Sequence, residues 1–191
     1  MTAGPARQLN HEMGQAKKLE TSRGFPPVVG VDPRVLVLGS LPGQASLAAQ
    51  QYYAQPQNAF WMIMGELCGA RPELGYADRL RKLKRAGIAV WDVLYEAARP
   101  GSLDSSIVAG SQTINDIAAL VSRHATIRVI AFNGQKAAEV FRRRVAPAVT
   151  RTDLETVTLP STSPAYASLK RTEKLARWRR ALRPYLQEAR A

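Results

Sequence analysis

The sequence predicts an α/β fold with three layers, α/β/α, around a central sheet of four mostly parallel strands. The chain has 191 residues, of which 46% are hydrophobic and 22% are charged, and these values fit one domain with a full-sized core. Four short runs are rich in apolar and β-branched residues, as strands are, and the first of them is bounded by turn residues. Helical segments separate the four runs, and strands that alternate with helices form a parallel sheet covered on both faces.

The four apolar runs are the expected strands. The first, 35–38, reads Val-Leu-Val-Leu and is typical of a strand buried on both faces. The others cover 88–91, 127–132 and 154–159. Apolar residues at helical spacing predict three helix faces that point to the core: Phe60, Ile63, Met64 and Leu67; Ile114, Ile117, Ala118 and Val121; Leu175, Trp178, Leu182 and Leu186.

Residues 1–24 are polar and show no sustained periodicity. We therefore expect a mobile basic extension over 1–24 and a single domain over 25–191. Lys and Arg number 27 against 15 Asp and Glu, which gives a net charge of +12. This charge favours a polyanionic partner, nucleic acid first and an anionic membrane surface second, because neutralised phosphates release counterions.

Several classes of protein are disfavoured by what the chain contains. No apolar run approaches the roughly 20 residues that span a bilayer, and no apolar signal core follows the N-terminus, so we expect a cytoplasmic protein, in the bacterial cytosol or nucleoid. The single cysteine, Cys68, excludes an intrachain disulfide. His11 and His124 are the two histidines, too few for a zinc cluster. We expect neither a metal nor a cofactor.

A turn rich in glycine follows the first strand and is the first candidate for a binding site. Ligands of open α/β sheets lie where parallel strands end. Small residues there let a ligand approach the backbone, and turn amides can point outward toward it. An ordinary turn between a strand and a helix would have a similar sequence. The candidate residues are Gly39, Ser40, Leu41, Pro42 and Gly43.

The ends of the later strands add polar candidates. Asp92 follows the second strand directly, where it could serve a pocket, cap a helix or pair with Arg99. Asn133 follows the third strand, either as a loop residue before a helix or as a pocket residue. The loop after the fourth strand has two prolines and several hydroxyl groups, which suit phosphate contacts.

Five blocks of sequence carry a family resemblance. In this order and spacing they resemble the hypoxanthine branch of the uracil-DNA glycosylase superfamily, over roughly residues 25 to 180. One block alone would be weak evidence for the family, but five blocks in the same order make a chance similarity unlikely. The blocks are GSLPGQASL, YYAQPQNAFW, WDVL with RPGSLDSSI after it, AFNG and LPSTSPAYASL.

The resemblance implies roles for individual residues. Asn58 stands where the hypoxanthine branch has its catalytic asparagine, and an amide can orient a water without titrating. Its alternative role is to cap the next helix. Leu41 stands where relatives with a GINPG loop have a water-activating amide, so that group is missing here. Relatives commonly show His and Arg at Gln55 and Gln57, which leaves the substrate range open.

The resemblance implies further roles in binding a DNA base that has been extruded from the double helix. Tyr53 stands where the family has an aromatic ring that stacks on the base, although Tyr52 or Tyr53 could instead be core. Asp92 stands where superfamily members read the base edge. The resemblance also implies a loop that enters the base stack, with Ala165 or Tyr166 filling the gap. This loop comprises Ser161, Thr162, Ser163, Pro164, Ala165 and Tyr166.

The resemblance implies a monomeric, monofunctional DNA glycosylase. It would extrude uracil or hypoxanthine from DNA and hydrolyse the N-glycosidic bond, leaving an abasic site. No lysine nucleophile stands at a matched position. Two alternatives remain open: a protein that binds deaminated or abasic DNA without cutting it, and a basic RNA-binding protein on the same fold.

Overall fold

A computed structural model of the protein describes residues 21–187. Its main sheet has the strand order β3-β2-β6-β7, and every neighbouring pair is parallel. The strands are β2 (Val35–Gly39), β3 (Ile88–Asp92), β6 (Val129–Asn133) and β7 (Glu155–Leu159). Each lies within a residue or two of its predicted position. The predicted four-stranded sheet and the α/β/α class are therefore confirmed.

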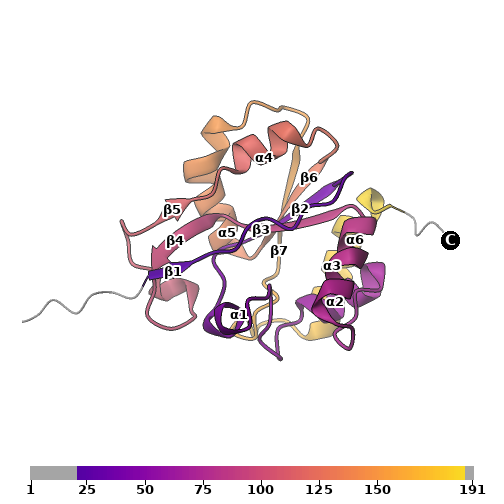
Figure 1. The fold of residues 1–191 in the computed structure, drawn as a ribbon, viewed down its shortest axis with the longest axis horizontal. Helices are drawn as coiled ribbons and strands as arrows, with labels where there is room; N and C mark the ends of the chain where they lie inside the picture. The colour runs from indigo at the N-terminus through magenta and orange to yellow at the C-terminus, as the bar shows by residue number, and fades with distance from the viewer. Residues whose placement is uncertain (1–20, 188–191) are drawn as a thin grey trace, which may run out of the picture.

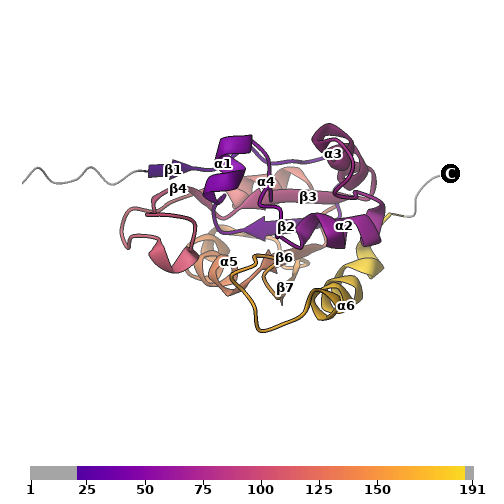
Figure 2. The same cartoon turned by 90° about the horizontal axis from the view of Figure 1, so that it is seen from below.

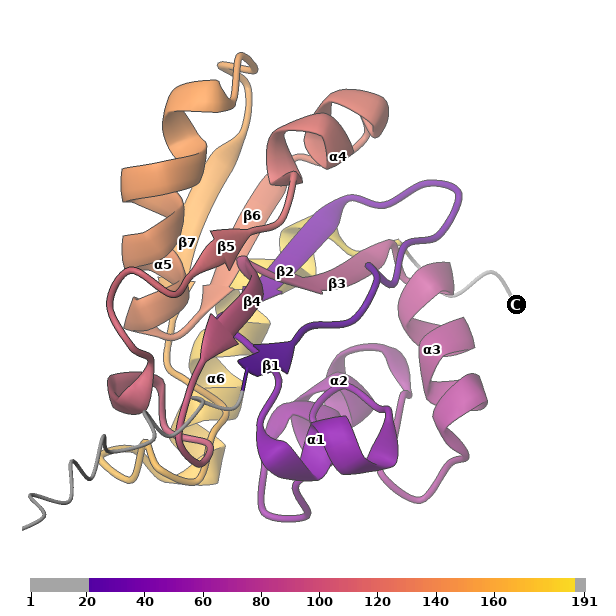
Figure 3. The ribbon, with the colours of Figure 1, turned by 60° about the vertical axis from the view of Figure 1, so that its left-hand side comes forward.

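Helices cover both faces of this sheet (Figure 1). The first face packs against α4 (Ile117–Arg123) and α5 (Gln135–Val140). The second face packs against α2 (Phe60–Cys68), α3 (Tyr76–Arg85) and α6 (Arg171–Leu182). Successive residues of β2 point to opposite faces and are fully buried on both, as the apolar run predicts. Figure 3 shows the two helical layers from the side.

A second, three-stranded antiparallel sheet was not predicted. Its order is β1-β4-β5, with β1 (Thr21–Arg23), β4 (Leu94–Ala98) and β5 (Thr113–Ile114). The expected extension over 1–24 is therefore wrong at 21–23, which pair with β4. The rest of that extension, 1–20, lies outside the described residues. Ile114 belongs to β5 and not to the helix that begins at Ile117, because its backbone pairs with Leu94.

Short helical elements complete the described chain. They are α1 (Gln44–Ala49), the 3-10 turns η1 (Asp104–Ser106), η3 (Ala146–Ala148) and η4 (Arg183–Tyr185), and the π-helical turn η2 (Phe141–Val145). The predicted core faces of α2 and α6 are confirmed, except that Leu186 follows η4, beyond the end of α6. Within residues 21–187, no helix is both long and apolar enough to cross a membrane.

Parallel pairing sends the carboxyl ends of all four strands to one edge of the sheet. The segments that follow them, α1 after β2 and the loop between β7 and α6, both lie at the bottom of Figure 1. Figure 2 looks at the molecule from that side. In α/β sheets of this kind ligands bind at this edge.

Candidate active site

A cavity of about 690 Å³ opens at the carboxyl edge of the sheet. Its lining comes from the ends of β2, β3 and β6, from the segment before α2, and from the loop after β7. Every site residue that the sequence predicts lies in this lining: Gly39, Ser40, Leu41, Pro42, Gly43, Tyr53, Asn58, Asp92, Asn133, Ser161, Thr162, Ser163, Pro164, Ala165 and Tyr166. Segments more than a hundred residues apart thus meet in one place.

Asp92 is the buried acid of this cavity. It ends β3 and is only 4% exposed. Its Oδ2 atom has no hydrogen-bond partner among the described residues. The neighbouring strand must carry glycine at Gly39, because a side chain there would collide with Asp92 Oδ1 and lie 3.3 Å from the Tyr53 hydroxyl. The helix-cap alternative for Asp92 is wrong, since strand β4 follows it.

Burial sets the ionisation of Asp92. Desolvation raises the pKa of its carboxyl group, and the charge of Asp104 raises it further, while Arg99 opposes both; the resulting pKa is about 7. Burial, followed by the charge of Asp92, also raises the pKa of the Tyr53 hydroxyl. At neutral pH Asp92 is therefore present in both its ionised and its protonated form.

Tyr53 and Tyr52 have different roles in the structure. Tyr52 borders the cavity but is only 3% exposed and packs in the core, and its hydroxyl donates to the Pro26 carbonyl at 3.2 Å. Tyr53 lines the cavity, and its ring is stacked on Phe60 with ring centroids 3.8 Å apart. Its backbone has a φ of 55°, a left-handed conformation that is uncommon for a non-glycine residue and that clusters at functional sites.

Asn58 lines the cavity and is also bonded to the start of helix α2. Its Oδ1 accepts the Phe60 amide N–H at 3.0 Å, at the first turn of α2. The N-cap residue of α2 is Ala59, so Asn58 precedes the cap and its side chain accepts the first N–H of the helix from there. This bond does not exclude a catalytic role. Because the amide N–H requires an acceptor, this bond turns the oxygen of Asn58 toward the helix. The Nδ2 donors, which bond to no described residue, remain for a ligand.

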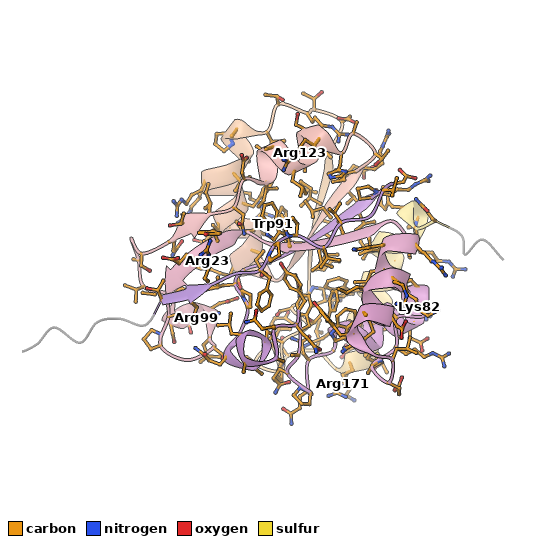
Figure 4. The ribbon with its side chains drawn as sticks, in the orientation of Figure 1. Arg23, Lys82, Trp91, Arg99, Arg123 and Arg171 are labelled. Carbon is orange, nitrogen blue, oxygen red and sulfur yellow. The ribbon has the colours of Figure 1, made fainter. Side chains whose placement is uncertain are left out.

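A second loop, residues 99–106, holds the glycine loop in place and was not predicted as part of the site. Arg99, only 1% exposed, donates to the Leu41 carbonyl at 3.3 Å and to the Pro42 carbonyl. Figure 4 labels Arg99 beside α1. Ser40 Oγ donates to Asp104 Oδ1 at 2.6 Å. Arg99 and Asp104 both belong to the RPGSLDSSI block of the sequence. That block contributed to the family resemblance, but nothing in it assigned a role to either residue.

The loop after β7 is fixed at its start by Thr162. Asn133 Nδ2 donates to Thr162 Oγ1 at 2.9 Å, and the Thr162 amide donates back to Asn133 Oδ1 at 2.8 Å. The Thr162 carbonyl accepts the Ala59 amide at 2.9 Å. Asn133 lines the cavity, but both ends of its side chain hold this loop. Gly134, with a φ of 100°, is needed beside it, since a side chain there would come within 3.1 Å of Ser161 Cβ.

Helix α6 supports the far part of the same loop. Trp178 Nε1 donates to the Pro160 carbonyl at 2.9 Å, and the buried Lys174 donates to the Ser163 carbonyl at 3.2 Å. The Lys174 ammonium also lies 5.2 Å from the centre of the Tyr166 ring. Tyr166 itself is 39% exposed. The loop therefore presents an aromatic side chain to solvent from a rigid base.

Residues 21–187 contain no group of three or more His, Cys, Asp or Glu that could hold a metal ion. The chemistry available in the cavity is that of an amide, a buried carboxyl group, a hydroxyl-bound carboxylate and an aromatic ring. In a cavity at the carboxyl edge of an α/β sheet, these groups suit a planar, polar ligand.

Residues 26–187 match the family model of the Uracil DNA glycosylase superfamily, and the chain belongs to this superfamily. DNA is therefore its substrate, and the predicted DNA glycosylase activity is confirmed at the level of the family.

Relatives and a solved structure agree with this assignment. A hypoxanthine DNA glycosylase of Methanosarcina acetivorans is 40% identical over 144 residues, which cover 75% of this chain and 87% of the relative. One of Methanosarcina barkeri is 37% identical over 118 residues, 61% of this chain and 73% of the relative. A solution NMR structure of a candidate uracil DNA glycosylase from M. acetivorans has a TM-score of 0.72 at 34% identity, and the match covers 87% of this chain and 99% of that one.

Proposed function

We propose that the protein excises deaminated bases, hypoxanthine and uracil, from DNA and leaves an abasic site. One observation supports this proposal above all. A single cavity contains both an amide that could position water, Asn58, and a buried carboxyl group that could meet a base edge, Asp92. The names of the two relatives favour hypoxanthine as a substrate. None of the residues that line the cavity is a lysine, which supports a monofunctional enzyme without a lysine nucleophile.

Asp92 would distinguish a deaminated base from a normal one. Hypoxanthine and uracil present a carbonyl group beside a ring N–H. Adenine and cytosine present an amino group beside a ring nitrogen that carries a lone pair. If an oxygen of the ionised Asp92 faces the ring nitrogen rather than the exocyclic group, it accepts a hydrogen bond from the ring N–H of the lesion but meets the lone pair of the normal base, which leaves that edge desolvated and repelled. A protonated Asp92 donates as well as accepts, so it fits both edges.

Cleavage would develop positive charge on the sugar and negative charge on the base. Asn58 would hold the attacking water through Nδ2 while its oxygen stays bonded to Phe60. The water oxygen would add to C1′ of the sugar as the base leaves with the electrons of the glycosidic bond, and the proton of the water would pass to the base anion. The side chain of Asp104, fixed by Ser40, would stabilise the sugar cation. The amides of Leu41 and Gly43 donate to no backbone carbonyl within residues 21–187 and could stabilise the base anion.

Extrusion of the base would use the loop after β7. Tyr53 would stack on the base inside the cavity, and Tyr166, rather than the smaller Ala165, would fill the gap in the duplex. The basic surface would neutralise phosphates on either side of the lesion. We further propose that the enzyme acts as a monomer in the bacterial cytosol or nucleoid.

The test is direct excision. The purified protein is incubated with duplexes that carry one hypoxanthine or one uracil, and alkali then converts abasic sites to strand breaks. We expect breaks at the lesion and none in the matched undamaged duplex. Specific binding without breaks would instead favour a non-catalytic binder of damaged DNA.

A further inference from the structure

Large apolar side chains that face solvent are few in residues 21–187. There are three: Val31 at 100% exposure, Leu103 at 54% and Tyr166 at 39%. Two of them, Leu103 and Tyr166, line the same cavity. A single exposed apolar residue needs no explanation, but two on the rim of one functional site indicate a binding role.

Hydrogen bonds on both sides of Leu103 fix the loop that exposes its side chain. Ser102 Oγ accepts the Gln44 amide at 3.0 Å, and the Gly101 carbonyl accepts from Gln44 Nε2 at 3.3 Å. On the other side of Leu103, Asp104 accepts from Ser40 at 2.6 Å. Leu103 thus lies between two anchored neighbours, and these bonds hold the loop in the conformation that exposes its side chain.

Leu103 and Tyr166 approach the cavity from different parts of the sheet. The loop of Leu103 is bound to the segment after β2, whereas the loop of Tyr166 follows β7. In the order β3-β2-β6-β7, strand β6 separates these two positions. A nucleotide that enters the cavity would therefore pass between an aliphatic and an aromatic side chain.

We propose that Leu103 is a second wedge, which inserts into the DNA base stack beside the extruded nucleotide while Tyr166 fills the gap from the other side. This inference rests on the proposed function. Apolar wedges are the means by which proteins unstack base steps. Duplex DNA suits this surface because the chain carries a net charge of +12, and an apolar partner protein would gain nothing from that charge.

The experiment compares Leu103→Ala with Val31→Ala in single-turnover excision. Val31 is an equally apolar exposed residue that precedes β2, at the amino edge of the sheet, so it is a matched control. Each variant acts on two substrates: a lesion in a fully paired duplex and the same lesion opposite an abasic site, where less stacking resists extrusion. We expect Leu103→Ala to lower excision from the paired duplex roughly tenfold and to change excision opposite the abasic site less than about twofold.

The remaining outcomes are decisive. Leu103→Met should keep near-parent activity, because its side chain is also long and apolar. Parent-like activity of Leu103→Ala on the paired duplex would overturn the inference, and so would an equal loss on both substrates, which would indicate a damaged cavity. If the parent excises no base at all, the proposed function fails. In that case Leu103 is tested by binding to a duplex that carries 2-aminopurine beside an abasic site. The fluorescence of 2-aminopurine should rise when the parent or Val31→Ala binds, but not when Leu103→Ala binds. Equal rises with all three proteins would overturn the inference.

Discussion

The two edges of the parallel sheet, where the strands begin and where they end, differ in how many of their buried polar groups have hydrogen-bond partners. At the amino edge, Thr126 Oγ1 donates to the Pro33 carbonyl at 2.8 Å, and the Arg151 guanidinium donates to the Ile127 carbonyl at 2.9 Å. At the carboxyl edge, the Tyr53 hydroxyl, Asp92 Oδ2 and Arg99 Nε are buried without a partner, three of the four such atoms in residues 21–187. Because unpaired buried polar groups are costly, their concentration at one edge indicates where a ligand completes the structure.

The largest effect is expected at Asn58, which lines the cavity at the carboxyl edge. Asn58→Ala should lower single-turnover excision by about a hundredfold or more, or about 2.7 kcal/mol of barrier, with little change in lesion affinity. It should also destabilise the fold by about 1 kcal/mol, because the Phe60 amide N–H loses its hydrogen bond to the Asn58 side chain. Asn58→Asp keeps the oxygen that accepts this bond and serves as the control for stability. Excision by Asn58→Ala at near the parent rate would refute the catalytic assignment.

Asp92 should make selectivity depend on pH. Only the ionised carboxylate rejects a normal base, so the ratio of hypoxanthine to adenine excision should rise as pH increases through about 7, the pKa of Asp92. Asp104→Asn removes a charge that raises this pKa and should move the midpoint to lower pH. Asp92→Asn should lower lesion excision and abolish the pH trend. A ratio that stays constant from pH 6 to about 8 would show that the edge is read elsewhere.

The charge of the carboxyl edge should appear in the salt dependence of binding. Raising salt from about 50 to 200 mM should weaken duplex binding by orders of magnitude if six or more phosphates are neutralised. Arg171 lies at the carboxyl edge and Arg123 at the opposite end (Figure 4). Arg171→Gln should weaken binding severalfold and reduce the salt slope by about 1, whereas Arg123→Gln should do neither. Equal effects of both variants would place the DNA elsewhere.

A substitution at the amino edge should lower the free energy of unfolding without changing the rate of excision. Arg151 donates to the Val121, His124 and Ile127 carbonyls and pairs with Asp153. Arg151→Met should lower the free energy of unfolding by roughly 2 kcal/mol, because bonds from a charged donor are lost. Excision well below the melting temperature should not change. A reduced excision rate in a folded variant would contradict the division between the two edges.

The sequence predicts those parts of the fold that depend on local pattern. Strands β2, β3 and β6 are short apolar runs that are buried on both faces, and such runs are visible in a sequence. Strand β7, which reads Glu-Thr-Val-Thr-Leu and is partly exposed, is visible instead through its β-branched residues. Strand β4 escaped prediction because it includes the charged Glu96 and because its partners, β1 and β5, are only three and two residues long.

The candidate site was predictable where a residue stands at a strand end or in a recognisable block. Asp92, Asn58 and the loop 161–166 were found in this way. Arg99 and Asp104 act through contacts between two loops about 60 residues apart, and no periodicity encodes such contacts. The near-neutral pKa of Asp92 was likewise unpredictable, because it depends on burial by residues distant in sequence.

Asp92 also makes the stability of the fold respond to protons. Its carboxyl group has an ordinary pKa of 3.8 and a folded pKa of about 7. As pH rises through this window the unfolded chain releases its proton first, so the contribution of Asp92 to the free energy of unfolding is complete below pH 3.8 and is lost by about pH 7. A base that donates its N–H to the ionised carboxylate would bind the folded state alone. The lesion would therefore stabilise its own enzyme most in the pH range where the empty cavity is least stable.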